Sequence, residues 1–198
     1  MWYNKDDREG GILVNIIFGG SFNPPTIAHM KIAEYLLDSF PKATLTFLPN
    51  GNRYHRKTLI DATHRIHMLQ LMADRFPKRV RISDHEAVQE TFLGTYHTLK
   101  QFERPYFVIG LDSLATIETW IEAEKLVREN DFLVIPRKGY TFESILEQSA
   151  LLKENAFRFT LLNHFPVCDA SSSAFRKTKN FDYLIPEIKQ YIIDHQLY

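Results

Sequence analysis

The chain has 198 residues, of which 44% are apolar, and this is enough to bury a sizeable core within one domain. Its 24 basic and 24 acidic side chains cancel to a formal net charge of zero. That balance argues against a general binder of nucleic acid polymers or membranes, whose excess of Lys and Arg should show in the sum.

The cysteine content and the amino-terminal residues bear on where the protein works. Cys168 is the one cysteine, which excludes a disulfide framework within one chain and fits a reducing compartment. Residues 1–11 are polar and lack the apolar core of a signal peptide, so we expect a flexible segment there, followed by a single domain over 12–198. The early apolar run is too short to span a bilayer. We therefore expect a soluble, cytoplasmic protein, and the sequence is compatible with a homo-oligomer.

Predicted strands and helices alternate along the chain. The apolar, β-branched runs predict strands at 12–18, 43–49, 79–83, 105–110, 131–136 and 157–162. Helical spacing of apolar residues predicts helices at 28–40, 61–76, 94–103, 112–129, 140–155, after 169–173, and at 186–195. This order indicates an α/β fold with a parallel sheet covered on both faces. The sequence contains neither G-x-x-x-x-G-K-[ST] nor G-x-G-x-x-G, so a nucleotide would be held by another device.

The stretch GGSFNPPTIAHM, residues 19–30, joins the first predicted strand to the first helix. Ligands of open parallel sheets bind at the carboxyl ends of strands. Gly19 and Gly20 would let a ligand approach the backbone, and the helix start offers free N–H groups to an anion. Thr26 and His29 share a face of the first turn, so we expect both side chains to point at that anion. The plain alternative is an ordinary turn with His29 as a partly buried histidine.

This stretch resembles the GG-[ST]-F-[DN]-P-x-[HT]-x-x-H signature of the nucleotidyltransferase superfamily that adenylates mononucleotides and phosphopantetheine. Thr26 stands where bacterial nicotinate-mononucleotide adenylyltransferases usually have His, although Thr is usual in eukaryotic mononucleotide enzymes and in phosphopantetheine adenylyltransferases. The resemblance implies a Rossmann-like, doubly wound nucleotidyltransferase fold. It also implies that Gly19, Gly20, Ser21 and Phe22 belong to the ATP site, with Thr26 and His29 on the reacting phosphates.

Two later segments resemble further blocks of the same family. FVIGLDSLATIETW, residues 107–120, resembles the I-G-x-D-[ST]-L-x-x-[IL]-x-x-W block of mononucleotide adenylyltransferases. In this block Gly110 would admit the nucleoside, Asp112 would accept its hydrogen bonds, and Trp120 would stack on the pyridine ring. A helix cap at Asp112 and a core position for Trp120 are the alternatives.

VCDASSSAFRK, residues 167–177, resembles the family's second nucleotide motif, I-S-S-T-x-[IL]-R. Ser172, Ser173 and Arg176 would hold the phosphates of ATP, because hydrogen bonds to charged groups are worth about 1.5–3 kcal/mol each. Cys168 lies in this segment, but no catalytic pattern surrounds it, and we expect it to fill space in the core.

Three weaker matches point to the mononucleotide. FLPNGNRYHRK, residues 47–57, resembles F-[IL]-P-x-x-x-P-P-H-K and offers Arg56 for a phosphate, with a solvated basic loop as the alternative. GTYHTL, residues 94–99, partly matches Y-T-x-D-T-L, which implies that Thr95 lies beside the pyridine ring, with an ordinary helix start as the alternative. Arg137 follows a predicted strand and is expected on the mononucleotide phosphate, with a surface arginine as the alternative.

The resemblance implies that ATP and nicotinate mononucleotide give nicotinate adenine dinucleotide and pyrophosphate, a step of NAD biosynthesis. The 5′-phosphate would attack the α-phosphorus of ATP, with His29, Thr26 and Arg176 as the catalytic groups and Mg²⁺ entering with ATP. No metal site of the protein itself is expected, because His64 and His67 lack a third ligand at suitable spacing. Nicotinamide mononucleotide as acceptor, phosphopantetheine adenylyltransferase activity, and a non-catalytic nucleotide-binding role remain as alternatives.

Overall fold

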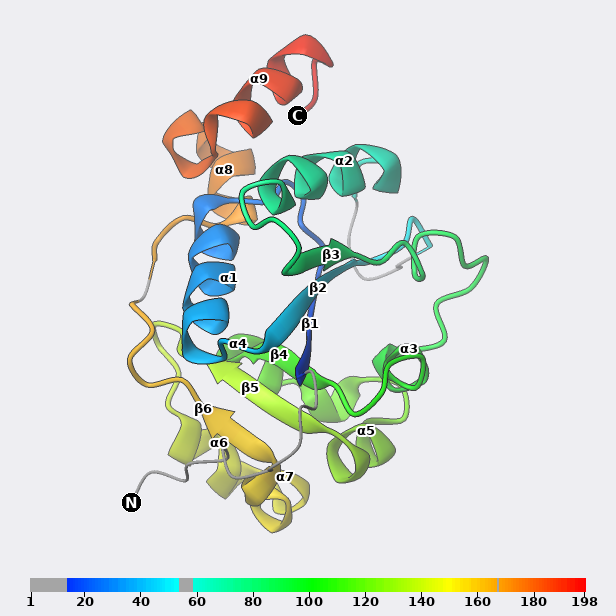
Figure 1. The fold of residues 1–198 in the computed structure, drawn as a ribbon. Helices are drawn as coiled ribbons and strands as arrows, with labels where there is room; N and C mark the ends of the chain where they lie inside the picture. Colours follow the sequence, from blue (N-terminus) through cyan, green and yellow to red (C-terminus); the bar gives the residue numbers. More distant parts are fainter. Residues whose placement is uncertain (1–13, 54–58, 167) are drawn as a thin grey trace.

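The computed structural model describes residues 14–53, 59–166 and 168–198. Its centre is a six-stranded sheet in which every neighbouring pair is parallel, in the order β3-β2-β1-β4-β5-β6 (Figure 1). The strands are β1 Val14–Gly20, β2 Ala43–Pro49, β3 Val80–Ile82, β4 Tyr106–Gly110, β5 Asp131–Ile135 and β6 Phe159–Leu161. The strand order reverses between β1 and β4, so the chain forms a doubly wound α/β fold, as the sequence predicts.

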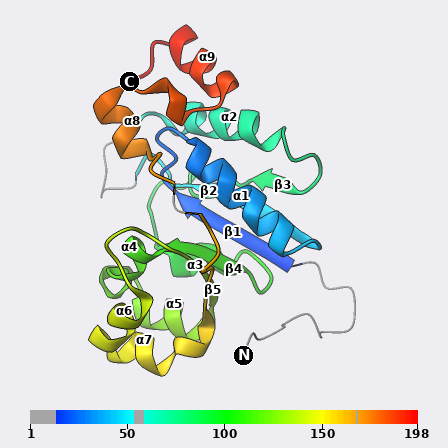
Figure 2. The ribbon, with the colours of Figure 1, turned by 90° about the vertical axis from the view of Figure 1, so that its left-hand side faces the viewer.

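Helices cover both faces of the sheet (Figures 1 and 2). One face packs against α1 Ile27–Ser39, α2 Ala62–Ala73, α8 Ser172–Thr178 and α9 Pro186–Asp194. The other packs against α3 Thr95–Leu99, α4 Leu111–Leu114, α5 Ala123–Glu129, α6 Phe142–Gln148 and α7 Ala150–Glu154. Short 3₁₀ turns occur at Ile117–Thr119, Ala156–Arg158 and Phe181–Tyr183. No helix in the described part of the chain is long and apolar enough to cross a membrane.

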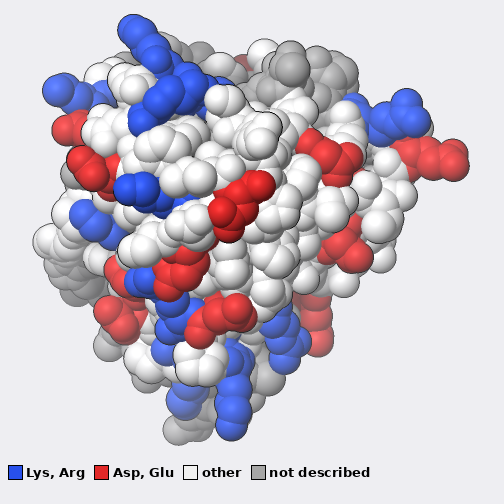
Figure 3. All heavy atoms as spheres, turned by 90° about the horizontal axis from the view of Figure 1, so that it is seen from above, with Lys and Arg blue, Asp and Glu red and all other residues white. Residues whose placement is uncertain are grey.

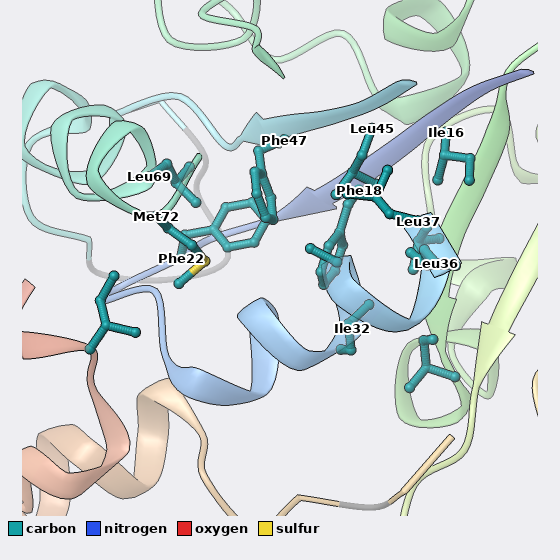
Figure 4. Packing of buried hydrophobic residues seen from close by; sticks show 14 of the residues in the cluster. Ile16, Phe18, Phe22, Ile32, Leu36, Leu37, Leu45, Phe47, Leu69 and Met72 are labelled. Atoms are coloured by element: carbon teal, nitrogen blue, oxygen red, sulfur yellow. The ribbon is translucent and has the colours of Figure 1, made fainter. Parts of the chain in front are cut away.

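Alternating side chains of β1 supply both halves of the core. Ile16 and Phe18 face α1, whereas Ile17 packs in the opposite layer. Phe22, just beyond the strand, turns back into the first layer and meets Phe18 and Phe47 edge to face, with ring centroids 5.5 and 5.4 Å apart (Figure 4). The end of β1 is therefore anchored by aromatic packing directly beside the β1–α1 loop, residues 21–26.

Three helix predictions need correction. The helix expected at 112–129 is broken into α4, a 3₁₀ turn and α5, because Trp120 is extended and Glu122 has a left-handed φ of 55°. The helix expected at 140–155 is broken at Ser149, whose hydroxyl caps α7 by accepting from the Leu152 N–H. The helix expected at 94–103 ends at Leu99. The segment expected at 1–11 lies outside the described residues.

Charged side chains do not gather by sign on the upper face of the molecule. Lys and Arg are interspersed there with Asp and Glu (Figure 3). This mixture agrees with the formal net charge of zero.

Arg65 of α2 is completely buried and holds the β1–α1 loop against that helix. Its guanidinium donates to the carbonyl oxygens of Ser21 and Ile60, each at 2.9 Å, and to the side chain of Asn52 at 3.4 Å. A planar fork of donors suits such a set of acceptors, which lie in different directions.

We expect Arg65→Lys to lower the free energy of unfolding by about 2 kcal/mol, because one ammonium cannot reach all of these acceptors and leaves part-buried carbonyl groups unpaired. Urea unfolding followed by circular dichroism measures this. The matched control is Arg75→Lys, which alters an exposed ion pair with Glu187 and should change stability by less than about 1 kcal/mol. An Arg65→Lys protein as stable as the wild type would contradict the assignment.

Candidate active site

A cavity of about 600 Å³ opens at the carboxyl ends of β1 and β4, where the strand order reverses. A smaller pocket of about 130 Å³ adjoins it. The lining residues common to both are Gly19, Gly20, Ser21, Phe107, Ser113 and Trp120. The position is the one at which open parallel sheets bind their ligands.

The larger cavity collects residues that lie far apart in the sequence. All of the residues predicted to bind ATP line it, namely Gly19, Gly20, Ser21, Phe22, His29, Gly110, Asp112, Ser172, Ser173 and Arg176. Trp120 and Arg137, predicted for the mononucleotide, line it as well. Thr95 and Trp120 line the smaller pocket. Arg56 lies outside the described residues.

Thr26 differs from its expected orientation. Thr26 is the N-cap of α1, is completely buried and does not line the cavity. Its backbone N–H donates to Nδ1 of His29 at 2.9 Å, and its hydroxyl lies 3.0 Å from the same nitrogen. Because a backbone N–H can only donate, Nδ1 is the acceptor and the ring proton of neutral His29 is on Nε2. Thr26 therefore orients His29, and the imidazole offers Nε2–H to a ligand.

The surroundings of His29 keep its ring uncharged. The ring lies against Phe22 and Phe18, with centroids 5.1 and 5.9 Å away. Burial, together with the positive charge of Arg137, lowers the pKa of His29 from 6.5 to about 3. The imidazole is therefore a neutral hydrogen-bond donor at neutral pH.

This pKa shift predicts a pH dependence of stability. The unfolded chain protonates His29 near pH 6.5, whereas the folded protein does so only near pH 3. Acidification across that interval should lower the free energy of unfolding by up to about 1.4 kcal/mol per pH unit, and the full contribution is present above pH 6.5. Urea unfolding at pH 7 and pH 5 should show a shallower loss for His29→Asn. An identical loss in both proteins would show that His29 is not the group responsible.

The start of α8 docks directly on the β1–α1 loop. The Ser172 hydroxyl donates to the carbonyl oxygen of Pro24 at 2.7 Å, and Arg176 Nη1 donates to that of Asn23 at 2.5 Å. Arg176 Nη2 also lies 3.3 Å from the Ser173 hydroxyl. The hydroxyl proton of Ser172 is thus engaged within the protein, whereas the exposed guanidinium of Arg176 has further N–H groups for an anion.

The carboxyl ends of β4 and β5 bring Asp112 and Arg137 together. Arg137 Nε lies 3.4 Å from Asp112 Oδ1 in a partly exposed ion pair. A Cβ at Gly110 would collide with Asp112 Oδ1 and lie 3.0 Å from Arg137 Nε, so a larger residue there would displace this ion pair. The sequence assigned these two charged residues to different substrates, but the structure places them side by side in the same cavity.

The smaller pocket has mainly apolar walls. Leu48, Phe92, Phe107, Trp120 and Ile121 form them, and the Trp120 ring meets Phe107 edge to face at 6.5 Å. Such walls suit a planar aromatic ring, since they provide apolar contact area, and the few polar side chains of the pocket can fix the orientation of the ring.

Asn50 and Glu86 line this pocket and were not identified from the sequence. Ser21 donates to Asn50 Oδ1 at 3.2 Å, and the buried Glu86 carboxyl accepts from Asn50 and Thr98, each at 3.1 Å. Burial raises the pKa of Glu86. This chain of hydrogen bonds joins the β1–α1 loop to α3. Asn50 follows a predicted strand, which is a usable signal, whereas Glu86 lies in an irregular segment without periodicity.

Two other sequence expectations can be compared with the structure. Cys168 lines the cavity and is half-buried, so its assignment to the core is wrong. His64 and His67 pack on Tyr191 of α9, with His64 Nδ1 2.8 Å from the Tyr191 hydroxyl. Over the residues that the structure describes, His, Cys, Asp and Glu form no cluster of metal-binding size.

Comparison with known proteins identifies the family. Residues 17–178 match the cytidylyltransferase-like family model. A probable nicotinate-nucleotide adenylyltransferase of Acholeplasma laidlawii is 37% identical over 190 residues, covering 92% of this chain and 96% of the relative. Another from Caldicellulosiruptor bescii is 33% identical over 186 residues, covering 89% and 94%.

Solved structures agree with these relatives. Nicotinic acid mononucleotide adenylyltransferase of Plasmodium falciparum, complexed with NaAD, superposes with a TM-score of 0.76 at 28% identity, covering 94% of this chain and 98% of that one. The same enzyme complexed with APC gives 0.74 at 27% identity, with the same coverage. The chain therefore belongs to the cytidylyltransferase-like family and, within it, to the nicotinate-nucleotide adenylyltransferases.

Proposed function

We propose that this protein transfers the adenylyl group of ATP to nicotinate mononucleotide, giving nicotinate adenine dinucleotide and pyrophosphate, as a cytoplasmic step of NAD biosynthesis. The observation that carries this proposal is the joining of a large polar cavity, lined by His29 and Arg176, to a pocket walled by Trp120. The related Plasmodium enzyme was solved with NaAD and with APC, which supports nucleotides as the substrates.

The cavity supplies donors for the reacting phosphates. The mononucleotide 5′-phosphate attacks the α-phosphorus of ATP in line, and pyrophosphate leaves, so no protein nucleophile is required. His29 Nε2–H donates to phosphate oxygens as a neutral group, and Arg176, which lines the same cavity, provides positive charge. Donors that are held in place before the reaction stabilise the developing charge without reorganising.

The ends of the two substrates fit different walls. Gly19 and Gly110 leave space for the nucleoside of ATP, and the Asp112 carboxylate accepts hydrogen bonds from it. Trp120 and Thr95 receive the pyridine ring in the smaller pocket. Arg137, which lines the larger cavity, contacts the mononucleotide phosphate, and its ion pair with Asp112 limits how far it moves.

Mg²⁺ is assigned to ATP rather than to the protein. Mg²⁺ usually keeps several waters and binds through substrate phosphates and one or two carboxylates. Asp112 and Asp169 are the carboxylates that line the larger cavity; Asp112 is paired with Arg137, and the described residues offer no cluster of three or more ligands. The ion therefore enters as part of the MgATP substrate.

Release of pyrophosphate from ATP, measured in parallel with nicotinate mononucleotide, nicotinamide mononucleotide and phosphopantetheine, tests the proposed function. We expect release with nicotinate mononucleotide and a loss of kcat/KM of about 100-fold or more in folded His29→Ala, because removing one such donor costs about that much. Preference for another acceptor would overturn the substrate assignment. Binding of ATP without release for any acceptor would favour a non-catalytic role.

Trp120→Ala tests the pyridine pocket. We expect the KM for the mononucleotide to rise about tenfold while the KM for ATP stays within about twofold, since stacking one ring on an aromatic side chain is worth about 1–3 kcal/mol. The control is Phe157→Ala, which removes an aromatic ring that is 73% exposed and does not line the cavity. An effect of Trp120→Ala confined to ATP would contradict the assignment.

A further inference from the structure

The segment that follows α9 returns to the β1–α1 loop. The Leu197 N–H donates to the Ile192 carbonyl at 3.0 Å and turns the chain back from the helix. The Tyr198 hydroxyl then donates to Asn23 Oδ1 at 2.7 Å. Figures 1 and 2 show this end of the chain beside α2 and α8, on the side of the molecule that carries the loop. A phenol from position 198 thus reaches the loop that precedes His29.

Asn23 is the point at which several segments meet. Only 2% of the surface of Asn23 is exposed. Its Oδ1 also accepts from the Ile60 N–H at 3.4 Å, and its carbonyl accepts from Arg176. A buried amide needs such partners, and the 2.7 Å bond from Tyr198 is much shorter than the one from Ile60.

The environment of Tyr198 keeps its hydroxyl a donor. Its ring meets Phe175 of α8 edge to face, with centroids 5.7 Å apart. Burial raises the pKa of the Tyr198 hydroxyl, although the charges of Arg65 and Arg176 oppose the shift. The charges of both guanidinium groups that hold the loop therefore act on the phenol, but burial keeps it protonated.

We propose that Tyr198 is a positioning residue for adenylyl transfer, which acts through Asn23 to hold the β1–α1 loop in the conformation that places His29 and Arg176 on the phosphates. Its kinetic consequence rests on the proposed function. Tyr198 does not line the cavity, so it contacts the loop and not the substrates.

Removal of the hydroxyl alone should loosen the loop while leaving the core intact. Phe at position 198 keeps the ring that packs on Phe175 and deletes only the bond to Asn23. Asn23 Oδ1 would retain the longer bond from Ile60. Small displacements of catalytic groups reduce rates strongly, and a shift of about 1 Å can cost about 100-fold.

The test is Tyr198→Phe in the full chain. We expect kcat/KM for ATP to fall about tenfold and the Kd of a non-hydrolysable ATP analogue to rise, while the KM of the mononucleotide stays within about twofold. The matched control is Tyr191→Phe, which removes the hydroxyl that lies 2.8 Å from His64 in the same carboxyl-terminal segment, away from the cavity. That variant should leave both substrates' constants unchanged.

A second variant tests whether Tyr198 acts through Asn23. If Tyr198 acts through Asn23, Tyr198→Phe should cause no further loss in an Asn23→Ala background, because the shared contact is already absent. Additive losses, equal effects of Tyr191→Phe and Tyr198→Phe, or unchanged kcat/KM and analogue binding in Tyr198→Phe would each overturn the proposal. If Asn23→Ala does not fold, Tyr198→Phe and its control Tyr191→Phe decide whether Tyr198 positions the loop.

If the wild type adenylates no mononucleotide, the proposed function fails, and titration with the ATP analogue still tests the role of Tyr198.

Discussion

The site depends on the need to pair the backbone carbonyl groups of the β1–α1 loop. The loop lies beyond the sheet and before the first helical turn, so the carbonyl groups of Ser21, Asn23 and Pro24 take their partners from side chains. Arg65 supplies one partner, Arg176 the second and Ser172 the third. Because buried carbonyl groups are costly to leave unpaired, α2 and α8 must both dock at this loop. The same contacts bring Arg176 to the cavity.

The helix cap links this framework to the chemistry. The first turn of α1 begins at Thr26, whose N–H is one of the donors that a helix leaves without an internal partner. Nδ1 of His29 accepts a hydrogen bond from this N–H. One hydrogen bond therefore both caps the helix and selects the tautomer of the imidazole. Phe22, anchored in the core, packs against the same ring. The same contacts therefore stabilise the loop and direct the Nε2–H of His29 toward the cavity.

Much of the fold followed from local patterns. The β-branched runs predicted the six strands close to their observed bounds, since strands buried on both faces have few polar positions. The helix breaks at 115–122 and at Ser149 were not predictable from spacing, because apolar residues kept helical periodicity across them. The left-handed backbone at Glu122 and the packing of Trp120 on Phe107 decided the first break. Glu86 escaped notice because burial, which makes it notable, is a tertiary property.

The sequence by itself determined the family and many of the residues that line the larger cavity. Glycines, serines and basic residues at the ends of strands and the starts of helices meet once the strands lie parallel, because parallel strands share one carboxyl edge. Only the tertiary structure decided what each side chain does there. Thr26 turns inward to orient His29, and Asp112 pairs with Arg137. Tyr198 holds Asn23 from 175 residues away. The orientation and the partners of these side chains depend on packing between segments that are distant in the sequence. The spacing of residues along the chain does not predict that packing.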